Sequence, residues 1–343
     1  MPLKRDLKGL SQGELESFFS ELGESSYRAR QVMVWMYHRF VSDFAVMSDV
    51  SKALREKLGE VAVISDLKEA ARKTAHDGTV KFLYETETGD RIESVLLREA
   101  GRTTLCLSSQ VGCALNCAFC ATGRMGYTRN LTAAEMVDQV IQAQKARPEP
   151  KITHVVFMGM GEPFLNYEQT LKAARLLNAE LGLGIGARKM TLSTAGIIPG
   201  ILKLAEEPLQ VKLAVSLNAP SQGLREKMMP IAKKFPLDKL ISAVRHYTKR
   251  TGKRMTFEYV LIERVNDTLL HAKQLADLTR GLLCKINLIP LNPFPGSEYA
   301  RPSPERVERF QAYLYPRCPA VTLRASKGSD ILAACGQLRA ERG

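Results

Sequence analysis

The chain has 343 residues, enough for one large α/β domain and a small additional one. Its composition, 45% hydrophobic and 25% charged, excludes a disordered or fibrous protein. A net charge of +13 exceeds what an enzyme of small neutral metabolites needs and favours a polyphosphate partner such as a nucleic acid. The surplus could equally serve solubility, so charge alone leaves both interpretations open.

The N-terminus carries charges where a signal peptide needs an apolar core, and no apolar run approaches the ~18 residues of a membrane span. We therefore expect a cytoplasmic protein with no membrane partner. The chain has seven cysteines, an odd number, and the cytoplasm is a reducing compartment. Both facts argue against a structural disulfide framework.

The first hundred residues divide into two predicted units. Residues 1–65 are predicted to form a helical accessory domain, because Ser11 and Glu14 make a capping box and apolar residues recur at helical spacing after it. Residues 66–100 are predicted to form a β-hairpin connection, since alternating runs flank the turn signal Gly89-Asp90.

A strand–helix alternation begins near residue 103 and continues almost to the end of the chain. Repeated βα units imply a parallel sheet with right-handed crossovers, which forms either a closed barrel or an open part-barrel. The functional site is then expected at the carboxyl ends of the strands. This α/β domain is predicted to span 101–343. Strands are expected at 103–108, 152–158, 188–193, 210–217, 255–262, 285–290 and 320–324, and helices from Thr132 and at 167–181, 237–250, 268–280 and 304–314.

Cys113, Cys117 and Cys120 follow directly on the first strand of this series. Closely spaced cysteine thiolates on one loop can hold an iron–sulfur cluster, and three ligands would leave one iron open for chemistry. A structural zinc site would need a fourth ligand, and the closest histidine is His154. The spacing favours a [4Fe–4S] cluster, with zinc as the alternative.

C-x-x-x-C-x-x-C on the loop after the first strand of a part-barrel resembles the radical SAM superfamily. The resemblance implies a partial (β/α)6 barrel and a [4Fe–4S] cluster on these cysteines. It also implies S-adenosylmethionine (SAM) on the open iron. An electron from a reducing donor of unknown identity would then split SAM into methionine and a 5′-deoxyadenosyl radical.

Four further motifs, at 104–113, 157–163, 288–296 and 330–338, are similar to the RlmN/Cfr family of RNA adenine methyltransferases. The resemblance covers nearly the whole chain. It implies a monomeric enzyme that methylates carbon-2 of an adenosine in 23S rRNA and in certain tRNAs. The alternative is the carbon-8 activity of the antibiotic-resistance (Cfr) type, and a rival of another class is a non-catalytic, zinc-dependent RNA-binding protein.

The same resemblance implies a SAM-binding wall at the ends of the strands. Gly159 and Gly161 follow a strand, where bare backbone could approach a ligand closely. The family usually has His where this chain has Asn218, so a side-chain contact there would change and a backbone contact would not. The residues implied to contact SAM are Gly161, Glu162, Ser193, Ser216, Leu217, Asn218 and Asn292.

The resemblance also implies catalytic roles for one glutamate and for two cysteines outside the cluster motif. Carbon-2 of adenine is too electron-poor to attack the methyl group of SAM. The resemblance implies that one SAM methylates Cys335 and that a radical from a second SAM activates this methyl for addition to the ring. Glu93 would accept the ring proton. Cys106 would release the RNA by forming a transient disulfide with Cys335, of the catalytic kind found in the cytosol.

The stretch 245–254 is basic, contains Tyr247 and has no acid. It suits a phosphate backbone and a stacked base. A helix C-terminus favours cations as well, so the stretch does not locate an RNA site by itself.

Overall fold

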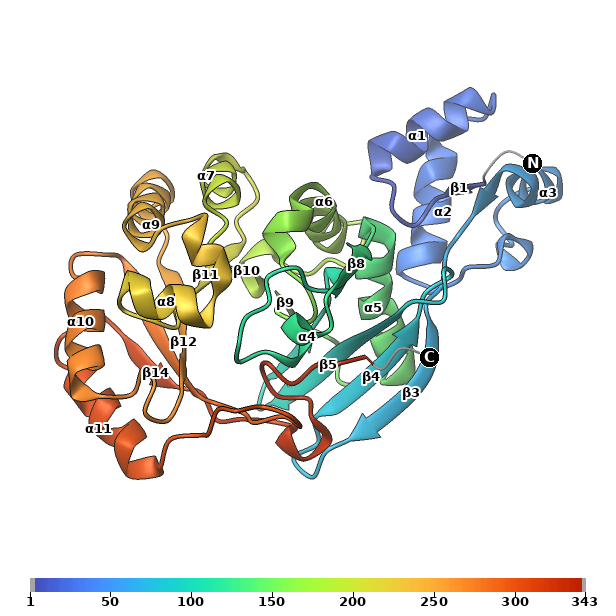
Figure 1. Ribbon diagram of the computed structural model, residues 1–343. Helices are drawn as coiled ribbons and strands as arrows, with labels where there is room; N and C mark the ends of the chain where they lie inside the picture. Colours follow the sequence, from blue (N-terminus) through green and yellow to red (C-terminus); the bar gives the residue numbers. More distant parts are fainter. Residues whose placement is uncertain (1–3, 341–343) are drawn as a thin grey trace.

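Three short helices form the N-terminal unit of the computed structural model, which describes residues 4–340 (Figure 1). The predicted capping box begins α1, because Ser11 Oγ accepts from the Glu14 amide and the Glu14 carboxylate accepts from the Ser11 amide at 2.7 Å. Apolar faces of the helices bury Phe19, Met33 and Leu58 together. The helices are α1 (Gln12–Glu21), α2 (Tyr27–Tyr37) and α3 (Lys52–Val61), and a two-stranded parallel ladder joins β1 (Arg5–Asp6) to β2 (Ala62–Val63).

A ten-stranded sheet is the framework of the rest of the molecule. Its parallel part follows the chain in order, with each strand beside the next, as is usual for consecutive βα units. The parallel strands are β6 (Arg102–Cys106), β9 (His154–Phe157), β10 (Met190–Thr194), β11 (Lys212–Ser216), β12 (Met255–Leu261), β13 (Cys284–Pro290) and β14 (Val321–Leu323). Antiparallel strands β5 (Arg91–Glu99), β4 (Val80–Glu85) and β3 (Lys68–Thr74) continue the sheet beyond β6.

Helices connect the parallel strands and cover the outer face of the curved sheet (Figure 1). Strands β14 and β6 do not pair, so the barrel stays open. The predicted partial (β/α)6 barrel is therefore the observed fold. The crossover helices are α5 (Ala133–Ala146), α6 (Tyr167–Asn178), α7 (Ile198–Glu206), α9 (Leu237–Thr251), α10 (Leu269–Thr279) and α11 (Pro304–Leu314).

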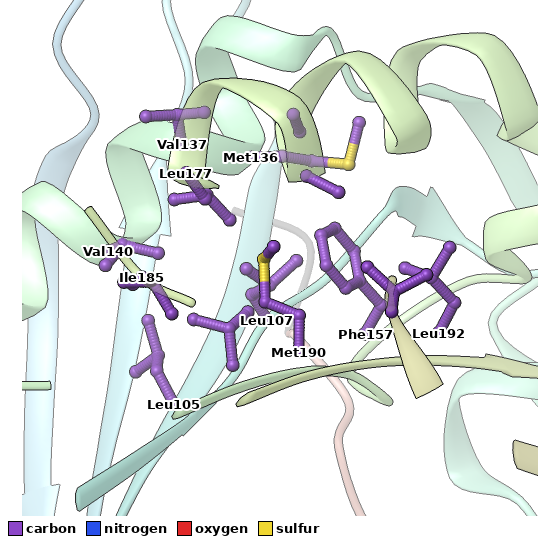
Figure 2. Packing of buried hydrophobic residues seen from close by; sticks show 14 of the residues in the cluster. Leu105, Leu107, Met136, Val137, Val140, Phe157, Leu177, Ile185, Met190 and Leu192 are labelled. Carbon is purple, nitrogen blue, oxygen red and sulfur yellow. The ribbon is translucent and has the colours of Figure 1, made fainter. Parts of the chain in front are cut away.

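Strand alternation separates an outer core from an inner lumen. Leu105 of β6, Phe157 of β9 and Leu192 of β10 point outward and pack against Val137 of α5 and Leu177 of α6 (Figure 2). Because side chains alternate across a strand, the neighbouring residues point into the barrel. The apolar outer layer holds the barrel together and leaves its interior free for polar chemistry.

Several elements were not expected from the sequence. All residues of β3 are exposed, so this edge strand shows no alternation of apolar and polar residues. The helix α7 contains Pro199 and Gly200, and a Cβ at Gly200 would lie 2.5 Å from the Phe164 ring. Short elements around the cysteine loop, namely β7 (Gln110–Gly112), α4 (Ala121–Arg124), β8 (Tyr127–Asn130) and α8 (Gln222–Met228), lack a full period of any pattern. No helix within residues 4–340 is long and apolar enough to cross a membrane.

A buried ion pair ties the N-terminal unit to the barrel. Lys8, 2% exposed, contacts Asp138 of α5 at 2.7 Å and Asp66 at 2.6 Å. We expect Lys8→Met to destabilise the protein by about 3–5 kcal/mol, because it strands the buried Asp138 carboxylate. Urea denaturation measures the loss. Lys52→Met removes an exposed pair with Glu56 and should change stability by less than about 0.5 kcal/mol. Equal losses of stability in the two variants would contradict a stabilising role for the buried Lys8 ion pair.

Candidate active site

The cysteine loop is held in place by the β7–β8 hairpin. The Cys113 amide donates to the Gly126 carbonyl at 2.8 Å. Gly112 has φ +73°, and a Cβ there would lie 1.9 Å from the Gly126 oxygen, so only glycine fits. The Cys120 amide donates to the Cys117 carbonyl at 3.1 Å and closes a tight turn. These contacts bring the three cysteines to the wall of one cavity of about 160 Å³.

The three thiols fit an iron–sulfur cluster as a donor set. Burial raises the pKa of Cys113 to about 12 and raises those of Cys117 and Cys120 as well, so the thiolates need a cationic partner. No three Cys, His, Asp or Glu side chains of residues 4–340 group tightly enough for a single metal ion. In a cluster, by contrast, each thiolate binds a separate iron.

A buried guanidinium behind the loop supports this fit. Arg225 is fully buried and donates to the carbonyls of Ala195, Ser216 and Leu217. Its Nη1 has no hydrogen-bond partner among the residues described. Burial lowers the pKa of Arg225 to about 10, and a Cys117 thiolate would oppose this shift. An anionic thiolate cluster would therefore stabilise the buried cation.

The wall of the same cavity also carries most of the predicted SAM residues: Gly161, Glu162, Ser193, Ser216 and Asn218. Glu162 is 3% exposed, and its two carboxylate oxygens accept from the amides of Phe164 at 3.0 Å and Ala195 at 2.7 Å. Burial raises the pKa of Glu162 to about 7, against the effect of these hydrogen bonds. The carboxylate is thus fixed in position, and its remaining lone pairs can accept from an ammonium group.

Two glycines let the backbone pass close to this wall. A Cβ on Gly159 would lie 2.7 Å from the Leu107 carbonyl, and one on Gly161, at φ +96°, would lie 2.5 Å from the Gln110 Cβ. The Glu162 amide donates to Gln110 Oε1 at 2.8 Å, so displacing Gln110 would also move Glu162.

We expect Gly161→Ala to weaken SAM binding by about 10-fold or more, because the added methyl group displaces Gln110 and Glu162. Calorimetric titration of the cluster-loaded protein with SAM measures the effect. Gly223→Ala is the matched control, since a Cβ at this helical position meets nothing within 4 Å. Unchanged affinity in Gly161→Ala would remove this turn from the SAM site.

Three predicted SAM residues have other contacts. Asn218, at φ +57°, accepts from the Val260 amide through its side chain at 2.9 Å, and its carbonyl accepts from Asn266 Nδ2 at 2.7 Å. Leu217 is fully buried and lines neither cavity. Asn292 also lines neither cavity and donates to the Cys335 carbonyl at 3.3 Å, which positions the segment that carries Cys335.

A second cavity of about 460 Å³ lies inside the barrel, with Cys106 and Cys335 in its wall. Cys335 lines both cavities and so stands at their junction. The C-terminal segment is tied to the cluster loop, because the Ala121 amide donates to the Gly336 carbonyl at 2.7 Å and Thr122 Oγ1 donates to the Leu338 carbonyl at 2.6 Å. Burial raises the pKa of Cys106 to about 12, the Cys335 thiol adds to this, and Arg324 opposes it.

Glu93 lies apart from the other predicted residues. It is 5% exposed, lines neither cavity, and forms an ion pair with Lys81 at 2.8 Å. Its other carboxylate oxygen accepts from the Arg339 amide at 2.8 Å. In this conformation Glu93 holds the C-terminal segment.

Two residues that the sequence did not single out also line both cavities. Glu258 of β12 is buried and accepts from Asn287 Nδ2 at 2.6 Å, and Arg324 lies close to Cys335, Cys106 and Glu258. An acid among the apolar residues of a central strand was the available signal for Glu258. Arg324 follows the end of β14 and carried no signal.

Comparison with known proteins identifies the family. Residues 5–64 match the family model of the ribosomal RNA large subunit methyltransferase N-terminal domain, and residues 107–276 match the radical SAM superfamily model. The dual-specificity RNA methyltransferase RlmN of Marinobacter nauticus is 46% identical over 98% of this chain and 92% of its own length. The chain belongs to the RlmN family.

Two further matches support the same family. The probable dual-specificity RNA methyltransferase RlmN of Geobacillus thermodenitrificans is 46% identical over 97% of this chain and 92% of its own length. The crystal structure of a radical SAM methyltransferase from Sphaerobacter thermophilus has a TM-score of 0.95 and 48% identity over 98% of this chain and 100% of that one. The predicted family, fold, cofactors and class, a SAM-dependent RNA methyltransferase using a [4Fe–4S] cluster, are thereby confirmed, and the zinc-binding alternative is set aside.

Proposed function

We propose that this enzyme methylates carbon-2 of an adenosine in 23S rRNA and in certain tRNAs through a methyl group carried by Cys335. The observation that carries the proposal is the position of Cys335 at the junction of two cavities. One cavity has the SAM wall and the cluster cysteines, and the other holds Cys106. A methyl group on Cys335 would face both. The relatives are named dual-specificity RNA methyltransferases, and the family model that matches residues 5–64 is named for a methyltransferase of the large ribosomal subunit RNA, which supports RNA targets of more than one kind.

In this proposal, separate groups of residues hold the cluster and SAM. Cys113, Cys117 and Cys120 would hold the cluster, and Gly161, Glu162, Ser193, Ser216 and Asn218 would hold SAM, supported from behind by Leu217 and Asn292. When bound and reduced by an external electron donor, these groups supply an organic radical able to remove hydrogen from a methyl group. The chain contributes the position of that methyl group and the exclusion of water around it.

Cys106 and Glu93 complete the proposed cycle. Cys106 attacks the sulfur of Cys335 and breaks the bond between that sulfur and the methylene carbon, which leaves with the RNA and takes up a proton to become its methyl group. The resulting disulfide requires an external thiol for reduction. Glu93 accepts the ring proton in a conformation that frees it from Arg339, whose amide it now binds. Because that contact lies four residues after Cys335, a rearrangement of the C-terminal segment that moves Cys335 would also release Glu93.

We further propose that the enzyme acts as a monomer. We also propose that 1–65 is an accessory domain, 66–100 a connection and 101–343 the catalytic unit. The match of the N-terminal family model to residues 5–64 supports the first division.

Mass mapping of RNA methylated by the purified, cluster-loaded enzyme tests the proposal. We expect 2-methyladenosine in a 23S rRNA fragment and in at least one tRNA, and no product without SAM. The stretches Glu162–Asn166 and Asn292–Gly296 resemble the carbon-2 branch, which favours this product. Formation of 8-methyladenosine would show the Cfr type of activity and overturn the proposal.

A further inference from the structure

The amino-terminal mouth of the barrel carries basic residues in the positions that face its interior. Alternate residues such as Thr104 and Cys106 of β6, or Asn287 of β13, line the large cavity. The next inward position toward the amino end of these strands is Arg102 on β6 and Lys285 on β13, and both line the same cavity. The same rule applied to every strand from β6 to β13 defines a basic ring: Arg102, His154, Lys189, Lys212, Arg254 and Lys285.

Strand register brings the members of the basic ring close to one another. Lys212 pairs in register with Thr191, two residues beyond Lys189, and Lys285 pairs with Thr256, two residues beyond Arg254, so these neighbouring ring members are offset by only two residues along their strands. Neighbouring strands are about 4.8 Å apart. Burial lowers the pKa of Lys212, and the charges of Arg102, Lys285 and Arg254 lower it further. The ring is therefore a concentrated region of positive charge.

The ring lacks acidic partners. No member forms an ion pair with any residue between 4 and 340. Of the acids in the cavity wall, Glu99 is the cross-strand neighbour of Arg102 but lies 3.6 Å from Lys327, and Glu258, deeper inside, accepts from Asn287. By contrast, Arg250 at the end of α9 pairs with Glu206 at 2.9 Å. Uncompensated like charges at this density favour an anionic ligand.

Small side chains lie between the ring and the reactive cysteines. The inward layer above the ring consists mainly of Thr104, Thr191, Ala214 and Thr256, which leaves the barrel hollow. The resulting cavity of about 460 Å³ runs from Arg102 and Lys285 at one end to Cys106 and Cys335 at the other. This volume falls in the range that encloses a small organic ligand such as a nucleoside.

We propose that the basic ring binds the phosphates flanking the target adenosine, so that the base enters the barrel through its amino-terminal mouth. The flipped base would then approach Cys335 from the side opposite SAM. This inference rests on the proposed function and names the surface by which the RNA docks. It also explains how SAM and RNA reach Cys335 without sharing an entrance.

Salt-dependent RNA binding tests the ring. Each phosphate contact contributes roughly 0.7–0.9 to the slope of log affinity against log salt. For cluster-loaded Lys212→Gln/Lys285→Gln, we expect the slope for a tRNA transcript to fall by about 1.5 and affinity in moderate salt to fall about 10- to 100-fold. The matched control is Lys227→Gln/Lys239→Gln, which removes the same charge from exposed positions beyond the carboxyl end of β11. It should retain the slope and bind within about 2-fold of wild type.

A second readout separates docking from folding. Methylation of Cys335 by SAM in the absence of RNA should be unchanged in the ring variant. If methylation of Cys335 falls in that variant, the variant Lys189→Gln/Arg254→Gln, at exposed positions of the ring, is tested in its place. It must then show the same decrease in the salt dependence of RNA affinity. A wild-type slope in a ring variant that methylates Cys335 normally would overturn the inference. Failure of the proposed function would look different, because wild-type enzyme would then form no 2-methyladenosine whatever its affinity for RNA.

Discussion

Cys335→Ala is expected to reduce RNA methylation below about one thousandth of the wild-type rate, because Cys120, the other thiol that lines both cavities, is one of the three predicted cluster ligands. Cluster content and SAM binding should remain close to wild type, since Cys335 lies outside the cluster loop and is not among the residues predicted to contact SAM. Methyl transfer from labelled SAM to RNA measures the loss, and iron and sulfide analysis measures the cluster.

Cys318→Ala is the matched control for this substitution. Cys318 is also partly buried, but it lines neither cavity and lies 3.9 Å from Thr279 Oγ1. The control should methylate RNA at close to the wild-type rate. Methylation of RNA by Cys335→Ala would show that the methyl group does not pass through this residue.

Cys106→Ala has the second largest expected effect, and it is of a different kind. The variant should still attach the methylene carbon of Cys335 to RNA, but it lacks the thiol that we propose attacks the Cys335 sulfur. We therefore expect a covalent protein–RNA species to accumulate up to about one equivalent per enzyme, with turnover lost. Denaturing gels with labelled RNA reveal the species, and nuclease digestion followed by peptide mass mapping locates it.

The double variant Cys106→Ala/Cys335→Ala serves as the control, because it cannot form this bond. Free methylated RNA released at the wild-type rate by Cys106→Ala would contradict the assigned role. A covalent species that mapped to a residue other than Cys335 would do so as well.

Much of this site could be predicted because its chemistry depends on local spacing. Cys113, Cys117 and Cys120 lie within eight residues of one another, so the sequence shows the cluster loop directly. The strand–helix alternation after residue 103 likewise follows from local hydrophobic periodicity. That alternation correctly predicts that Glu162, Ser193 and Ser216 lie at one edge of the sheet.

Other features depend on contacts between distant residues. Asn218 could not be interpreted from sequence, because its side chain is used by the Val260 amide, 42 residues away. Glu93 is held by Arg339, 246 residues away, and no local pattern reports such a contact. The basic ring was missed for the same reason. Its members are isolated charges at the starts of separate strands, and only the sheet register brings them together.

The most direct test of the central claim is to follow the methyl group on the protein. Cluster-loaded enzyme is incubated with methyl-labelled SAM in the absence of RNA, freed of SAM, and supplied with unlabelled SAM and RNA for one turnover. The account predicts label on the Cys335 peptide before RNA is added and on carbon-2 of the adenosine afterwards. Label that never appears on Cys335, or RNA product that carries only unlabelled methyl groups, would contradict it.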